Sequence, residues 1–175
     1  CHTQQVRPLD QDKVFGRPSA PGDFAYATPE LLGSERTGPD LTNIGARQPS
    51  AVWQFIHLYN PRAVVPESIM PGYRHLAQRE LDYADIGDRM RVNRIEGVPY
   101  TDEMIENARA DVERQLDPAA DGVKEFLARY PKAQVRQFDG DPSRVTELDA
   151  VIAYLQMLGT LVDFAKFDEE GPNLR

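Results

Sequence analysis

The chain begins with a cysteine followed by a histidine, two side chains that can attach or ligate a cofactor. Cys1 is the only cysteine, so it cannot form a disulfide within the chain. The remaining possibilities for this cysteine are a free thiol, a disulfide to another molecule, or covalent attachment of a cofactor. The three histidines, His2, His57 and His75, are scattered along the chain and do not indicate a structural zinc site.

A methionine between prolines is the second feature with possible chemistry. Met70 lies within residues 66–72 (PESIMPG), where turns on both sides would fix its sulfur in place. A core methionine normally lies at helical spacing instead, where its flexibility fills gaps. A fixed thioether suits an axial iron ligand, and a Met/His pair raises the reduction potential of haem iron.

The dipeptide Cys1-His2 matches the last two residues of the haem-attachment pattern C-x-x-C-H. Met70 is a possible second iron ligand for such a haem. Both features are compatible with a haem iron attached through Cys1 and ligated by His2 and Met70, although each is a weak signal when taken alone. A buried loop methionine and an exposed terminal histidine are the alternatives.

The elements that must position these residues differ between the two ends of the chain. The first 72 residues hold nine of the 14 prolines and six of the 12 glycines, which predicts a loop-rich segment. One short helix is predicted at about 50–59, capped by Ser50. Its apolar side would be Val52, Trp53, Phe55, Ile56 and Tyr59. Such a segment has little core of its own and is easier to stabilise around a large apolar ligand.

Helices dominate the rest of the chain. Residues 76–116 are predicted helical with a break at 97–99, after which Thr101 starts a new helix. Asp117 and Pro118 are predicted to cap and start a third helix. Residues 131–143 are predicted as a polar loop or a short strand, and 146–162 as a terminal helix that opens with a variant capping box, Thr146 to Asp149. The predicted fold class is therefore mostly α.

Composition and charge exclude several classes of function. Of the 175 residues, 41% are hydrophobic and 27% charged, and no apolar run is long enough to span a membrane, which predicts a soluble domain. The net charge of −8 is concentrated in residues 101–175, which hold 16 acidic and 9 basic residues. An acidic surface argues against a nucleic-acid partner and permits a basic protein partner, although a solvated surface is the simpler interpretation. The chain lacks a starting methionine and a signal peptide, so we expect an upstream part that could hold an anchor.

Five stretches, in order, resemble class I c-type cytochromes and, more closely, the mono-haem cytochrome c subunit of cbb3-type cytochrome c oxidases. They are CHTQQVRP, GSERTGPDL, HLYNPRAVVPESIMPGY, GVPYT and ELDAVIAYLQMLGT, and they run from residue 1 to about residue 160. The resemblance implies a single cytochrome c domain over 1–175. Within it, 1–75 would wrap the haem, 76–145 would be a helical extension or insertion, and 146–162 the C-terminal helix.

The resemblance also implies roles for individual residues. Cys1 would form the second thioether, His2 would be the proximal ligand and Met70 the distal ligand of one covalent haem c. The Pro39 carbonyl would accept a hydrogen bond from the His2 ring, and Arg36 would lie near a haem propionate. The residues expected to line the haem edge or the packing behind it are Trp53, Tyr59, Ile69 and Leu155. The first cysteine of the motif, the helix before it and the anchor would belong to the upstream part.

By this resemblance, the chain would be an electron-transfer subunit of a bacterial terminal oxidase and not catalytic alone. It would lie on the periplasmic face of the inner membrane and relay electrons from a donor cytochrome c or a di-haem cytochrome c subunit. The acceptor would be the membrane-embedded haem–copper subunit that reduces oxygen to water. Two alternatives are a haem-less structural or assembly subunit of the same complex and a free-standing cytochrome c.

Overall fold

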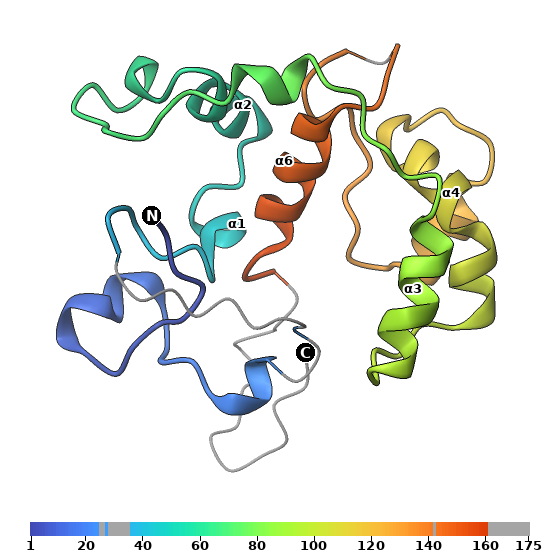
Figure 1. The fold of residues 1–175 in the computed structure, drawn as a ribbon, viewed down its shortest axis with the longest axis horizontal. Helices are drawn as coiled ribbons and strands as arrows, with labels where there is room; N and C mark the ends of the chain where they lie inside the picture. The colour runs from blue at the N-terminus through green and yellow to red at the C-terminus, as the bar shows by residue number, and fades with distance from the viewer. Residues whose placement is uncertain (25–26, 28–35, 142, 161–175) are drawn as a thin grey trace. The chain divides into compact units, whose positions relative to one another are not determined.

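The structure of the chain, a computed structural model, describes residues 1–24, 27, 36–141 and 143–160 (Figure 1). The α-helices of this part are α1 (Ile44–Arg47), α2 (Ala51–Tyr59), α3 (Ile86–Ile95), α4 (Asp102–Leu116), α5 (Val123–Arg129) and α6 (Glu147–Met157). The 3-10 helices are η1 (Asp10–Phe15), η2 (Pro21–Phe24), η3 (Pro61–Ala63) and η4 (Arg74–Ala77). Among the described residues there is no strand, only an isolated antiparallel bridge between Glu80 and Thr146. The predicted mostly α class is confirmed.

The described residues form two compact units. The first unit holds residues 1–49 and 155–160, and the second holds 50–154. Helix α6 therefore begins in the second unit and ends in the first. The single domain expected over 1–175 stays a prediction.

In the first unit, the end of α6 is joined to the segment around α1. Gly45 N–H donates to the Leu158 carbonyl at 2.8 Å, and Gln156 Nε2 donates to the Pro49 carbonyl at 2.5 Å. A Cβ on Gly45 would lie 2.2 Å from the Gln156 carbonyl oxygen, so only glycine allows this close approach of two backbones. These contacts join the end of α6 to the residues that follow the GPDL stretch.

The second unit begins with α2, where the structure confirms the predicted cap. The Ser50 hydroxyl accepts a hydrogen bond from Trp53 N–H at 3.2 Å, which satisfies one donor of the first turn. After η3 and the following loop, the chain returns to the end of α2, where Tyr73 N–H donates to the Leu58 carbonyl at 2.7 Å. The loop between them, which carries Met70, is thereby closed at its base.

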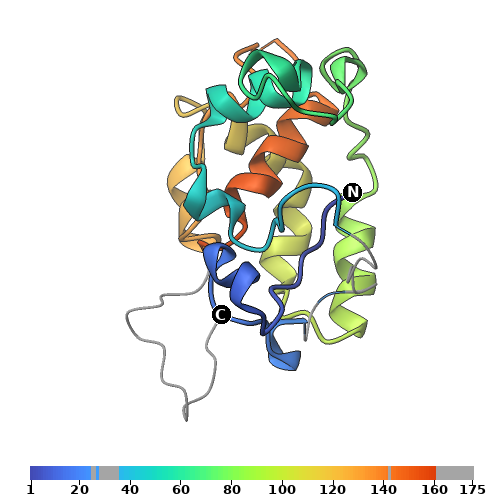
Figure 2. The ribbon, with the colours of Figure 1, turned by 90° about the vertical axis from the view of Figure 1, so that its left-hand side faces the viewer.

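Helices α3 and α4 run side by side in both views (Figures 1 and 2) and share a small core. Met90 of α3 packs with Ile105 and Ala108 of α4. The predicted cap of α4 is confirmed, because the Thr101 hydroxyl accepts from Met104 N–H at 3.2 Å. Arg129 of α5 binds the buried carboxylate of Asp111 at 2.5 Å and so joins α5 to α4.

Two predicted helix starts are wrong. Residues 78–85 are not helical, because Leu81 N–H donates to the Val145 carbonyl and Glu147 N–H donates to the Arg79 carbonyl, a pairing between distant segments. The third helix does not start at Pro118. Asp117 instead accepts a hydrogen bond from Ala119 N–H at 2.8 Å and forms a turn, and α5 begins after Gly122, whose φ is +84°.

Helix α6 begins with the predicted capping box. Thr146 N–H donates to the Asp149 carboxylate at 2.9 Å, and Asp149 N–H donates back to the Thr146 hydroxyl at 3.1 Å. Burial raises the pKa of the Asp149 carboxyl. The helix ends at Met157, ahead of Gly159 with φ +82°, and the predicted helical residues Leu161 and Val162 lie outside the described residues.

No helix among the described residues combines the length and the apolar character needed to cross a membrane.

Candidate haem site

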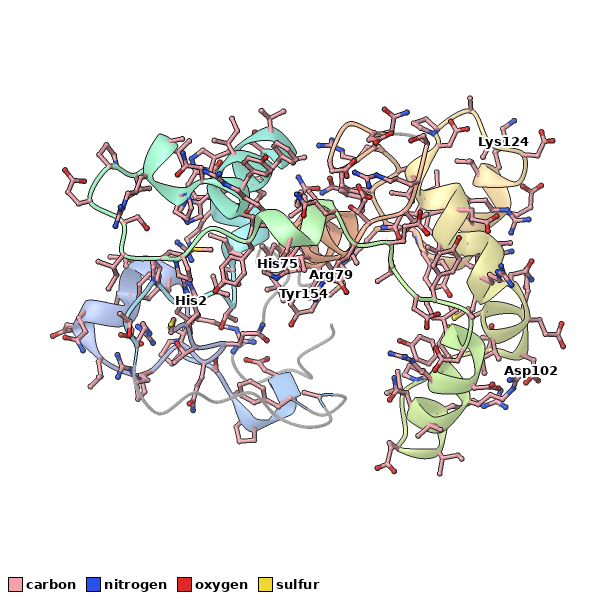
Figure 3. All side chains as sticks on the ribbon, turned by 45° about the horizontal axis from the view of Figure 1, so that its top comes forward. His2, His75, Arg79, Asp102, Lys124 and Tyr154 are labelled. Atoms are coloured by element: carbon pink, nitrogen blue, oxygen red, sulfur yellow. The ribbon has the colours of Figure 1, made fainter. Side chains whose placement is uncertain are left out.

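The His2 imidazole, whose place in the fold is labelled in Figure 3, makes a hydrogen bond to the backbone. His2 Nδ1 lies 2.7 Å from the Pro39 carbonyl oxygen. Because a carbonyl oxygen can only accept, Nδ1 must carry the hydrogen, and the lone pair is then on Nε2. Histidines that ligate metals normally donate their other ring N–H in this way, which fixes the tautomer and raises the basicity of the ligating nitrogen. His2 therefore has the geometry of an oriented metal ligand.

Gly38 makes this position of the ring possible. A Cβ on Gly38 would lie 2.5 Å from His2 Cε1 and 2.9 Å from Nδ1, so any larger residue would collide with the imidazole. The backbone at Gly38 has no positive φ, so the requirement for glycine here comes from the close approach of the ring. The imidazole of His2 is thus held in place by the Gly38 backbone on one side and by its own hydrogen bond to the Pro39 carbonyl.

Backbone hydrogen bonds join the residues around His2 to residues 37–41. The Cys1 carbonyl accepts from Thr37 N–H at 2.9 Å and from Gly38 N–H at 2.8 Å. The Thr3 carbonyl accepts from Leu41 N–H at 2.9 Å. The Cys1 side chain is exposed, as a thiol that forms a bond to another molecule must be. The start of the chain is thereby fixed on both sides of His2, while the thiol stays accessible.

Arg36 lies at the centre of a buried polar network in the first unit. Its guanidinium donates to both oxygens of Asp12, at 2.8 and 3.0 Å, and to the Thr3 hydroxyl at 2.9 Å. Arg36 and then Arg7 hold the pKa of the Asp12 carboxyl well below its usual value. No local pattern marks Asp12, which is separated from Arg36 by a long stretch of chain. The expected contact of Arg36 with a propionate stays a prediction.

Met70 lies in a loop anchored to the end of α2. Its N–H donates to the Ser68 hydroxyl at 3.2 Å, and Arg62 Nε donates to the Ser68 carbonyl at 3.1 Å. A Cβ on Gly72 would lie 2.9 Å from the Tyr59 carbonyl oxygen, so the chain after Met70 passes close to the last residue of α2. Met70 is half-buried, whereas its neighbour Ile69 is 75% exposed. These contacts hold the backbone on both sides of Met70, and the role of its sulfur as a ligand stays a prediction.

The aromatic residues expected near the haem both belong to α2. Trp53 is half-buried and stacks on His57 with 4.5 Å between the ring centroids. Tyr59 is exposed at the end of the helix, with the Arg74 guanidinium 5.2 Å from its ring centroid. Their expected roles at the haem edge stay predictions.

The structure thus groups the predicted site residues into two sets. The first unit brings together Cys1, His2, Arg36 and Pro39 and also contains the half-buried Leu155. The second unit contains Trp53, Tyr59, Ile69 and Met70. The ligation of one iron by residues from both sets stays a prediction.

The residues of the first unit fit a haem with polar substituents. Buried side-chain atoms normally have hydrogen-bond partners. Among the described side-chain atoms of this unit that have none are the Thr42 hydroxyl oxygen and Gln156 Oε1. The hydroxyl of Thr42 can donate to a carboxylate, while His2 supplies an oriented nitrogen and Cys1 an exposed thiol. Imidazole, thioether and thiol are the groups that proteins use to hold and ligate haem c. Thr42 was missed by the sequence analysis, although it directly follows the GPDL stretch.

Comparison with known proteins identifies the family of this chain. No curated protein matches the chain. A family model described as cytochrome c oxidase, mono-haem subunit/FixO, matches residues 1–162. This match covers nearly the whole chain and agrees with the resemblance noted in the sequence, so the chain belongs to the FixO family, the mono-haem cytochrome c subunits of cbb3-type cytochrome c oxidases.

Proposed function

We propose that this subunit binds its one haem covalently through Cys1, uses His2 and Met70 as axial ligands, and relays electrons to the haem–copper subunit of the oxidase. Membership of the family gives one haem and a place in an oxidase complex. The observation that carries the rest is the His2 imidazole, whose Nδ1–H is donated to the Pro39 carbonyl at 2.7 Å and whose Nε2 is left to bind iron.

The haem, when bound, takes up and releases one electron. The residues of the chain set how easily this happens. The Pro39 carbonyl holds the Nδ1 proton of His2 and so keeps Nε2 basic. The neutral thioether of Met70 favours the reduced state and raises the reduction potential. Two side-chain ligands also leave no open position for oxygen, so the subunit itself would do no bond chemistry.

The family and the charge of the chain support the proposed partners. We place the subunit on the periplasmic face of a bacterial inner membrane, next to the membrane-embedded haem–copper subunit and a di-haem cytochrome c subunit. A donor cytochrome c or the di-haem subunit would supply the electrons. The net negative charge of residues 101–175 would favour basic neighbours, since opposite charges steer association.

An alkaline pyridine haemochrome spectrum of the natively matured subunit tests this proposal first. A band typical of two saturated vinyl groups would support attachment through Cys1 and a cysteine upstream of it. A band shifted to the red would mean a single thioether through Cys1. The absence of haem in natively matured protein would contradict electron relay and leave a structural or assembly subunit.

A second measurement tests the distal ligand. Met70→Ala should abolish the visible absorption band that reports a methionine–iron bond, whereas Val65→Ala, at an exposed position of the same loop, should keep it. If both variants keep the band, Met70 is not the ligand.

A further inference from the structure

Four charged side chains form a cluster in contact with the segment that carries His2. They are Arg7, Asp12, Arg36 and Asp40, which we call the charge cluster. The side chains of Asp12 and Asp40 are 1% and 0% exposed, and that of Arg36 is 10% exposed. Asp12 accepts from Arg36 at 2.8 Å and from Arg7 at 3.1 Å. Two positive and two negative charges balance each other within the cluster.

Burial of such charges has a cost that the protein must offset. A carboxylate loses its hydration when buried, and pairing with hydrogen bonds offsets this loss only when the geometry is good. Buried ion pairs are therefore often retained for the arrangement that they enforce, with little gain in net stability. The position of the charge cluster indicates which arrangement is enforced here.

The charge cluster binds the residues next to both partners of the His2–Pro39 hydrogen bond. Asp40, which follows Pro39, accepts from the Thr3 hydroxyl at 2.5 Å and from Gln5 N–H at 2.9 Å. Thr3 follows His2, and its hydroxyl oxygen also accepts from Arg36 Nε at 2.9 Å. A shift of the cluster would therefore move the His2 ring and the Pro39 carbonyl relative to each other.

We propose that Asp12, Arg36 and Asp40 are positioning residues that lock residues 1–5 onto residues 36–41 and thereby fix both the orientation of the His2 imidazole and the charge around it. The inference rests on the proposed ligation of iron by His2. It adds that the reduction potential of this haem depends on the balance of buried charge in the cluster.

The test uses the full subunit matured within the oxidase complex, with Asp12→Asn and Arg36→Gln as the main variants. Asp12→Asn leaves a buried positive charge without its partner, so the reduction potential of this haem should rise. Arg36→Gln leaves a buried negative charge, so the potential should fall. The double variant removes both charges, and its potential should return toward the wild-type value.

Asp10→Asn is the matched control. Asp10 lies in the same 3-10 helix as Asp12 and loses the same charge, but its side chain is 95% exposed. Water screens a charge at such a position, so the potential should stay at the wild-type value. If Asp12→Asn shifts the reduction potential no more than Asp10→Asn does, the proposal is overturned. It is also overturned if Asp12→Asn and Arg36→Gln shift the potential in the same direction and the double variant shows the sum of the two shifts.

An uncharged pair of variants tests the positioning independently, including the case in which Asp12→Asn does not accumulate. Thr3→Val removes the hydroxyl that joins Asp40 to Arg36, and Thr3→Ser keeps it. The electron paramagnetic resonance signal of the oxidised haem reports ligand orientation. It should change in Thr3→Val and return to the wild-type form in Thr3→Ser. An unchanged signal in Thr3→Val would overturn the positioning role.

The wild-type complex separates failure of this inference from failure of the proposed function. If the wild-type subunit has no haem, or its spectrum shows no histidine ligand, the proposed function fails before any variant is compared. If the wild type shows the expected haem and the variants do not shift, only the positioning role fails.

Discussion

Substitution of Gly38 by alanine should disturb the His2 ligand more than any other change of one methyl group. The added Cβ would lie 2.5 Å from His2 Cε1, whereas ordinary contacts begin at 3.4 Å, so the ring would have to move by about 0.9 Å. The same movement applied to the Nδ1–O distance of 2.7 Å would bring it to about 3.6 Å, which is no longer a hydrogen bond. Overpacking costs about 1–3 kcal/mol and the lost bond about 0.5–1.5 kcal/mol, so we expect about 2–4 kcal/mol of destabilisation.

The assay compares haem content, reduction potential and thermal unfolding of Gly38→Ala with those of Gly22→Ala in the matured subunit. Nothing lies within 4 Å of a Cβ on Gly22, which belongs to the same unit, so this control should unfold within about 0.5 kcal/mol of the wild type. Gly38→Ala should weaken the bond between His2 and the haem iron and so shift the reduction potential, because the loss of a partner that orients a metal ligand typically lowers metal affinity by about 10–100-fold. Equal behaviour of the two variants would refute the role assigned to Gly38.

Three further predictions concern the distal ligand, a buried ion pair and acid stability. Met70→Ala should lower the reduction potential by on the order of 0.1 V, within the roughly 0.8 V that axial ligands span. In a redox titration, Val65→Ala should stay near the wild type, and an equal drop in both variants would argue against ligation by Met70. Arg129→Ala should destabilise the second unit by about 2 kcal/mol in thermal unfolding because it removes the Arg129 hydrogen bonds to the buried Asp111 carboxylate, to which Arg114 stays bound at 2.9 Å. Lys124→Ala, at an exposed position of the same helix, should have little effect (Figure 3), and similar losses in both variants would contradict this reasoning. The lowered pKa of Asp12 implies a contribution to stability that is complete above its ordinary pKa and lost as the pH falls below it. The difference in unfolding midpoint between wild type and Asp12→Asn should therefore shrink as the pH is lowered from about 5, and a constant difference would contradict it.

The parts of the fold that the sequence predicted depend on short-range chemistry. Ser50, Thr101 and Thr146 were each predicted at the start of a helix, and in the structure each hydroxyl accepts an N–H of the first turn. A cap needs only a polar side chain three residues before an unpaired donor, so the information is contained within one turn. The same holds for the loop around Met70, where prolines and a glycine define the turns.

The predictions that failed depend on partners far along the chain. Residues 78–85 carry a loose apolar pattern, but backbone pairing with the segment around Val145 prevents the helix. Ile95 continues the apolar spacing of Ile86 and Met90 in the sequence, yet it is 83% exposed because α3 packs on α4 mainly through Met90 and Ile86. At Asp117, a side chain that could cap a helix instead closes a turn. In each case the local sequence is compatible with both a helix and a loop, and contacts with distant residues determine which of the two forms.

For the candidate site, the resemblance predicted the hydrogen bond between His2 and Pro39 but not the polar network behind it. The pair His2 and Pro39 was predicted from the resemblance and lies at 2.7 Å. Asp12 could not be predicted, because nothing in its own stretch distinguishes it from the exposed Asp10. Only the folded chain, which brings η1 to Arg36, shows that one of these carboxylates is buried and the other is solvated.

The geometry of Arg36 also limits how it could bind a haem propionate. A guanidinium has five N–H donors. Four are used by the protein, in bonds to the Thr3 hydroxyl, to each oxygen of Asp12 and to the Gln5 carbonyl. A propionate near Arg36 could therefore accept at most one N–H unless it displaced Asp12, and the bidentate pairing that makes arginine a strong carboxylate ligand is already formed within the protein. Because Asp12 is already bound in this way, the main effect of Arg36 on the haem would be exerted through the position of Thr3 and the neighbouring His2.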